Sequence, residues 1–154
     1  MSNEVNYVAA ARRHLNDGRL LLEQGRRANA GQLFGFSIEC GLKALLLASG
    51  VARGTDGGIA GEDPNNPGKK HPLRTHMPSL SAKITTYDHL IPDGSQMTRY
   101  MAMLPSLQQG RDWHVDHRYW DESRIPLSSV PGWEQAAVEA NDMLDQVQLD
   151  GVLS

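Results

Sequence analysis

Three long stretches of this chain carry apolar residues at the spacing of an α-helix, which places them in one stripe on a helix surface. The first, about residues 5–24, has charged residues between Val8, Ala11, Leu15 and Leu22. The second, about residues 28–49, is the most apolar and carries Phe34, Ile38, Leu42, Leu45 and Leu46. The third, about residues 132–149, has the most regular stripe: Trp133, Ala136, Ala137, Ala140, Met143, Leu144 and Val147. These stripes predict three long helices, with the second at the centre.

Two shorter helices are predicted between them. One covers about residues 75–87, with Thr75 as its N-cap and Pro78 in its first turn, where a missing N–H costs little. The other covers about residues 95–107, and Pro105 is expected to end or kink it. Its apolar positions are Met97, Tyr100, Met101, Leu104 and Leu107. No stretch alternates apolar and polar residues as a strand would, so the pattern predicts an all-α bundle of four or five helices.

Residues 51–72 interrupt this pattern with a run of glycine, proline and asparagine that offers almost nothing apolar to bury. Such a composition is typical of a long flexible loop. The glycines do not form a phosphate-binding loop, because the G-x-x-x-x-G-K-[ST] motif is absent and no strand precedes them. We expect one domain over residues 1–154, with this loop inside it.

The composition limits the classes of function. A net charge of −3 gives no general attraction to duplex nucleic acid, so any such role must come from a local site. The single cysteine, Cys40, lies in an apolar helical stretch and is expected to be a buried, inert thiol. The first residues lack the basic and apolar regions of a signal peptide, and no apolar run approaches a membrane span. We therefore expect a cytoplasmic protein without a membrane partner.

Residues 110–120 concentrate the polar chemistry of the chain. This segment holds two of the three tryptophans and two of the six histidines, together with two arginines, two aspartates and a tyrosine. It has no clean apolar period. An ordinary connector does not need this composition, so we take the segment as the candidate functional element.

The helical stretches resemble the HEPN domain (higher eukaryotes and prokaryotes nucleotide-binding). The resemblance covers most of the chain and lies in Leu20-Leu21-Leu22-Glu23-Gln24-Gly25, in Ile38-Glu39-Cys40-Gly41-Leu42-Lys43-Ala44-Leu45-Leu46, and in the stretch from His71 to Leu80. It implies an antiparallel helical bundle, a homodimer, and either metal-independent RNA cleavage or a non-catalytic role beside a nucleotidyltransferase or an antitoxin. It implies no cofactor.

Cleaving members of that family carry an arginine, four to six residues, and then a histidine, often followed by H-x-Y. Arg111, His117 and Tyr119 match this pattern with five intervening residues. Histidine titrates near neutrality and can remove a proton from a ribose 2′-hydroxyl, while arginine can bind the scissile phosphate. The resemblance therefore implies a catalytic set of Arg111, His117 and Tyr119, in which His117 is the general base.

Other interpretations of the segment stay open. Trp113 and the neighbouring aromatic residues can instead anchor a long crossing to the bundle, with Arg118 paired to Asp112, Asp116 or Glu39. A metal site at His114, Asp116 and His117 lacks a further ligand, so we expect no metal. The commonest spacing in cleaving members is four, which would place Asp116 at the histidine position. We therefore favour a non-catalytic RNA- or nucleotide-binding or dimerisation module over a metal-independent endoribonuclease.

For binding RNA or a nucleotide, we expect contacts from four further polar side chains besides the catalytic set. These are Arg118, His114, Lys43 and Glu39.

Overall fold

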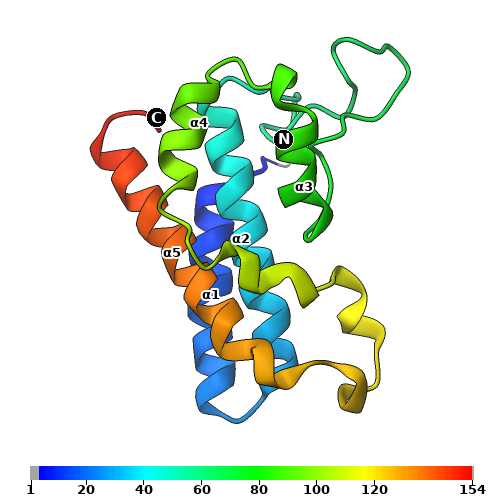
Figure 1. The fold of residues 1–154 in the computed structure, drawn as a ribbon, viewed down its shortest axis with the longest axis vertical. Helices are drawn as coiled ribbons and strands as arrows, with labels where there is room; N and C mark the ends of the chain where they lie inside the picture. The colour runs from blue at the N-terminus through cyan, green and yellow to red at the C-terminus, as the bar shows by residue number, and fades with distance from the viewer. Residues whose placement is uncertain (1–3, 154) are drawn as a thin grey trace.

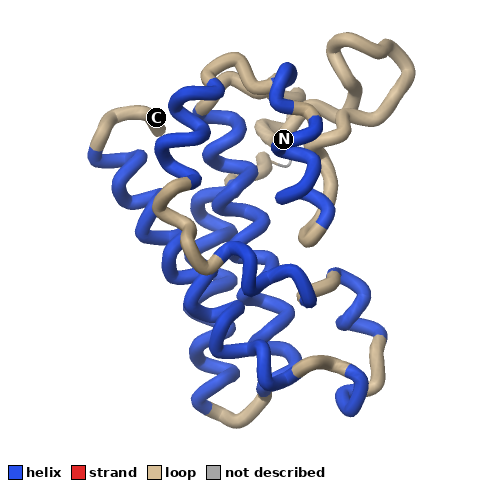
Figure 2. The backbone as a smooth tube through the Cα atoms, in the orientation of Figure 1, coloured by secondary structure: helices blue, strands red, loops and turns tan. Residues whose placement is uncertain are grey.

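A computed structural model describes residues 4–153, and over this range the chain forms helices and loops but no strand (Figure 1, Figure 2). The all-α prediction is thereby confirmed. The α-helices are α1 (Tyr7–Glu23), α2 (Arg27–Ala48), α3 (Ser79–Thr86), α4 (Gly94–Met101) and α5 (Val130–Leu149). Short 3-10 helices connect the later ones.

The three long helices contact one another and form the centre of the molecule. Figure 1 shows α1 running antiparallel to α2, whereas α5 runs in the same direction as α2. Asn6 begins α1 because its side chain accepts a hydrogen bond from the Ala9 amide at 3.0 Å. Gly25, with φ of 76°, follows the end of this helix in the left-handed conformation that glycine adopts readily.

Helix α2 is buried over most of its length, as its apolar stripe predicts. It is also long and apolar enough to pass a length-and-composition test for a membrane span, which corrects the expectation that no segment approaches one. Core helices of soluble proteins pass the same test, and 72% of the apolar window of α2 is buried inside the bundle. The packing is that of a central bundle helix.

The two shorter helices were predicted too long. Helix α3 begins at Ser79, after Pro78, so Thr75 is not its N-cap. A proline disfavours helical backbone in the residue before it, which excludes Met77 from the helix. Helix α4 ends at Met101, three residues before Leu104, whose backbone is likewise restricted by the proline that follows.

Residues 51–72 form a loop, as predicted, but the loop is tied to the bundle. Within it, isolated bridges between Arg53 and Ile59 and between Glu62 and Lys70 close two smaller turns. Ile59 is buried in the core, and its amide donates to the Tyr7 hydroxyl at 3.1 Å. The expectation that this stretch buries almost nothing was wrong for Val51 and Ile59, because single apolar residues between glycines show no period.

Candidate functional site

Residues 110–120 cross the bundle in two 3-10 helices, η2 (Leu107–Asp112) and η3 (Val115–Tyr119). Trp113 separates them and is buried, with 1% of its surface exposed. Its indole N–H donates to the Gly31 carbonyl of α2 at 2.9 Å, and its ring meets Phe36 edge-on. The segment is therefore anchored to α2 by a tryptophan.

Glycines on α2 make room for this anchor. A Cβ at Gly35 would lie 1.8 Å from Cε2 of Trp113, and a Cβ at Gly31 would lie 2.8 Å from Cε3 of Trp133. Indole rings of Trp113 and Trp133, rather than a neighbouring backbone, occupy the space that these glycines leave.

Asp112 links the segment to α5. Its carboxylate accepts the Trp133 indole N–H at 2.9 Å and the hydroxyl of Ser129. Asp112 is therefore engaged with α5 and its N-terminal flank, and Arg118, which we considered as its partner, packs on the Tyr119 ring instead, 4.8 Å from the centroid.

His117 is buried, with 5% of its surface exposed. Its Nδ1 accepts the backbone N–H of His114 at 3.4 Å, and its ring lies 4.5 Å from the Trp120 ring, measured between centroids. Burial, followed by the charge of His114, holds the pKa of His117 below its ordinary value of 6.5. At neutral pH the ring is therefore uncharged, and because Nδ1 accepts a hydrogen bond, Nε2 carries the proton.

His117 forms part of the wall of a hollow of about 420 Å³, which we call the His117 hollow. The hollow lies between the α1–α2 turn, the start of α2 and residues 117–125. Polar side chains from both sides line it: Arg26, Asn29, Gln32, His117, Arg118 and Glu122. Gln32 also donates to the Val115 carbonyl at 3.1 Å, which holds η3 against α2. Among residues 4–153, neither Arg26 nor Arg118 forms an ion pair with a carboxylate.

Arg111 does not line the His117 hollow. Its exposed side chain borders two other hollows, one with Asp112, Ser128 and Ser129, and one with residues of α3. The sequence pairs Arg111 with His117, but in the folded chain the two side chains face different hollows. Tyr119 is 74% exposed, and His114 is exposed with its Nδ1 accepting the Asp116 amide at 3.1 Å.

Glu39 and Lys43 lie elsewhere, in the interior. Their side chains pair at 3.1 Å, and Oε1 of Glu39 also accepts the Met77 amide at 3.0 Å and lies 3.1 Å from Nδ1 of His76. This cluster joins α2 to the segment before α3, and neither residue lines the His117 hollow. Beside it, burial raises the pKa of Cys40 to about 11, so its thiol stays protonated.

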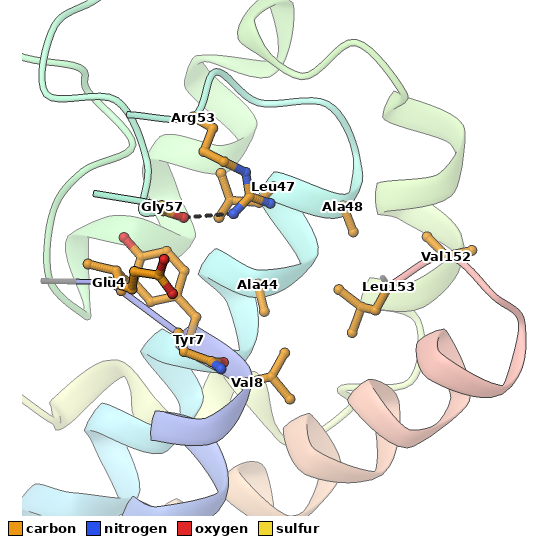
Figure 3. Close-up of a pocket in the computed structure, with 12 residues that line it drawn as sticks. Glu4, Tyr7, Val8, Ala44, Leu47, Ala48, Arg53, Gly57, Val152 and Leu153 are labelled. Atoms are coloured by element: carbon orange, nitrogen blue, oxygen red, sulfur yellow. Dashed lines mark hydrogen bonds between the residues drawn. The ribbon is translucent and has the colours of Figure 1, made fainter. Parts of the chain in front are cut away.

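A second sizeable hollow, of about 510 Å³, lies at the other end of α1 (Figure 3). Figure 3 shows the Arg53 guanidinium above it, donating to the Gly57 carbonyl at 2.7 Å, with Val8, Ala44 and Leu153 on the opposite side. None of the predicted site residues lines it. Over the described range, no three His, Cys, Asp or Glu side chains come together in a group that could hold a metal ion.

The sequence pattern does not identify the residues of the α1–α2 turn and of the start of α2 that line the His117 hollow. Arg26, Asn29 and Gln32 complete the His117 hollow from about ninety residues away along the chain. The only local signal is Arg26-Arg27 directly after the helix-ending Gly25, and a pair of arginines at a helix end is common because they interact favourably with solvent. Their position opposite His117 follows only from the packing of η3 on α2.

Comparison of the chain with protein-family models, with curated proteins and with solved structures gives no match. The HEPN resemblance therefore remains an expectation, and the functional argument depends on the geometry of the site.

Proposed function

We propose that this protein is a non-catalytic RNA- or nucleotide-binding helical module of the HEPN type, and that the His117 hollow is its binding site. One observation carries the proposal: a buried histidine lines the same hollow as two arginines, neither of which forms an ion pair among residues 4–153. Among residues 4–153 the His117 ring makes its hydrogen bond through Nδ1, so its Nε2–H is available to a ligand in the hollow.

The chemistry of the lining suits a phosphate group. A guanidinium presents several N–H donors in a planar fork that matches phosphate oxygens, and the hollow has one from Arg26 and one from Arg118. The neutral His117 ring adds a donor through Nε2. Glu122 is the one carboxylate in the lining, so the charge there is positive overall.

The same geometry argues against His117 as the general base within one protomer. A base must present an unprotonated nitrogen to the hydroxyl that it deprotonates. Here the lone pair of Nδ1 accepts the His114 amide, which leaves the proton on Nε2. Arg111, which would bind the scissile phosphate, borders other hollows. This arrangement supports binding rather than cleavage.

Metal-independent RNA cleavage is the second candidate, and the exposure of Arg111 and Tyr119 favours it, because exposed side chains are available to a second copy of the chain. In a symmetric dimer, Arg111 of one protomer could then complete a site at His117 of the other. A nucleotidyltransferase or antitoxin partner would be compatible with either function.

Titration of a labelled single-stranded oligonucleotide tests the binding proposal. We expect Arg26→Ala and Arg118→Ala each to weaken binding by removing one phosphate contact. For two such contacts, the logarithm of the binding constant should fall with the logarithm of salt concentration with a slope of about −1.4. Arg13→Ala, which removes an exposed arginine on α1, is the matched control and should leave the affinity unchanged. Equal losses in all three variants would contradict the assignment of the site.

Incubation of RNA with the protein in EDTA separates the two candidates. The binding proposal predicts that the RNA stays intact over the same period in wild type and in Arg111→Ala. Cleavage by wild type that disappears in Arg111→Ala, with the helical circular-dichroism spectrum preserved, would establish the endoribonuclease instead.

A further inference from the structure

Trp120 differs from the other two tryptophans in its exposure. Trp113 and Trp133 are each 1% exposed, whereas Trp120 is 47% exposed. Its side chain borders the His117 hollow. It also borders another hollow, of about 480 Å³, which Asp121 and Arg124 line and which is distinct from the hollow in Figure 3. The indole therefore forms a wall shared by two hollows, each of a size typical of ligand sites.

The backbone on both sides of Trp120 is held in place. Its own amide donates to the His117 carbonyl at 3.1 Å and closes η3. Asp121 then caps the next turn, η4 (Glu122–Arg124), by accepting from the amide and the hydroxyl of Ser123 at 2.9 and 2.7 Å. On one side the ring meets the ring of the buried His117 edge-on, at an interplanar angle of 61°. A half-exposed aromatic ring held in this way is preorganised, which lowers the entropy cost of binding to it.

We infer that Trp120 stacks on an unpaired nucleobase, so that the ligand of this site is single-stranded RNA rather than duplex RNA. This inference rests on the proposed function and specifies its ligand. Aromatic rings in basic grooves bind single strands by stacking on successive bases. Trp120 offers the ring, while Arg26 and Arg118 offer phosphate contacts on the same side as His117.

The charges indicate where the phosphate lies. In the hollow lined with Asp121 and Arg124, the Asp121 carboxylate, whose pKa is lowered by hydrogen bonds from Ser123, offsets the charge of Arg124. The His117 hollow instead holds two arginines against one carboxylate. The phosphate is therefore expected in the His117 hollow, with a base against the indole. A duplex keeps its bases paired and stacked inside, and two arginines in a chain of net charge −3 offer few contacts to its backbone.

Binding of fluorescein-labelled oligouridylate to the full chain, followed by anisotropy, tests the inference. The same strand with abasic sites and the same strand annealed to its complement serve as ligands that lack accessible bases. We expect both to bind about tenfold or more weakly than the intact single strand. Trp120→Ala should lose affinity for the intact strand by the same factor, whereas Trp120→Phe, which keeps an aromatic face, should retain most of it. Leu149→Ala, at an exposed site on α5, is the control for an exposed apolar side chain.

Tryptophan fluorescence gives a second readout. Because Trp113 and Trp133 are buried, quenching by the intact strand should come from Trp120 and disappear in Trp120→Phe. If wild type and Trp120→Ala bind the intact and abasic strands equally, while Arg118→Ala weakens binding, the stacking inference is wrong and the proposed site stands. If wild type binds no strand, the proposed function fails and the inference fails with it.

Discussion

Gly35 is the position at which one added carbon atom should matter most. A Cβ there would lie 1.8 Å from a carbon of the buried Trp113 ring, which packs against α2 and cannot move aside without breaking its bond to Gly31. We expect Gly35→Ala to lower the free energy of unfolding by about 3 kcal/mol, despite the better helix propensity of alanine. Urea unfolding measures the loss.

Gly94→Ala is the matched control for that substitution. Gly94 begins α4, and no atom lies within 4 Å of a Cβ built on it. The alanine should therefore leave the protein as stable as wild type or slightly more stable. Equal stability of the two variants would show that Trp113 does not pack on Gly35.

At the scale of elements, the crossing between α4 and α5 depends on Trp113. We expect Trp113→Ala to cost about 3–5 kcal/mol in unfolding free energy, because it empties a buried indole site. Trp113→Phe should recover part of the lost unfolding free energy, since it restores a ring but not the hydrogen bond to the Gly31 carbonyl. Chemical denaturation of the three proteins provides the comparison, and a silent Trp113→Ala would exclude the anchoring role.

At the scale of the whole molecule, three half-buried or buried histidines couple stability to pH. Burial lowers the pKa of His14, His71 and His117 below 6.5 in the folded protein. As pH falls below 6.5, these histidines are protonated in the unfolded chain before they are protonated in the folded protein. The folded protein should therefore lose stability in that range. Unfolding by urea at a series of pH values measures this dependence.

His71 allows a specific test of this coupling. It is 1% exposed, its Nδ1 accepts the Leu73 amide at 3.1 Å, and its Nε2 has no partner within the described residues. His71→Asn keeps an acceptor for that amide but does not titrate. We expect a shallower loss of stability below pH 6.5 in this variant, and an unchanged pH profile would contradict the contribution of His71.

The oligomeric state also belongs to the whole molecule. The HEPN resemblance leads us to expect a homodimer, and Tyr119, which is 74% exposed, is available to an interface. Light scattering should give about twice the chain mass of 16.9 kDa, and Tyr119→Arg should shift the protein towards the monomer if that ring lies in the interface. A monomeric wild type would contradict the expectation.

The sequence by itself determined the class of fold and the three long helices. Helical periodicity is a local property, so Leu15, Leu42 and Leu144 show their helices without reference to the rest of the chain. The predicted ranges of the two short helices were too long, because apolar residues continue past the helix ends into loops that are also buried, as at Leu104.

Only the tertiary structure decided which polar groups share a hollow. Arg111 and His117 are close in sequence but face different hollows, because Trp113 between them is fixed in the core and turns the backbone. Arg26 is distant in sequence but lies beside His117, because η3 packs on the start of α2. Periodicity records which side of a helix is buried, whereas contacts between distant segments depend on packing that no local pattern contains.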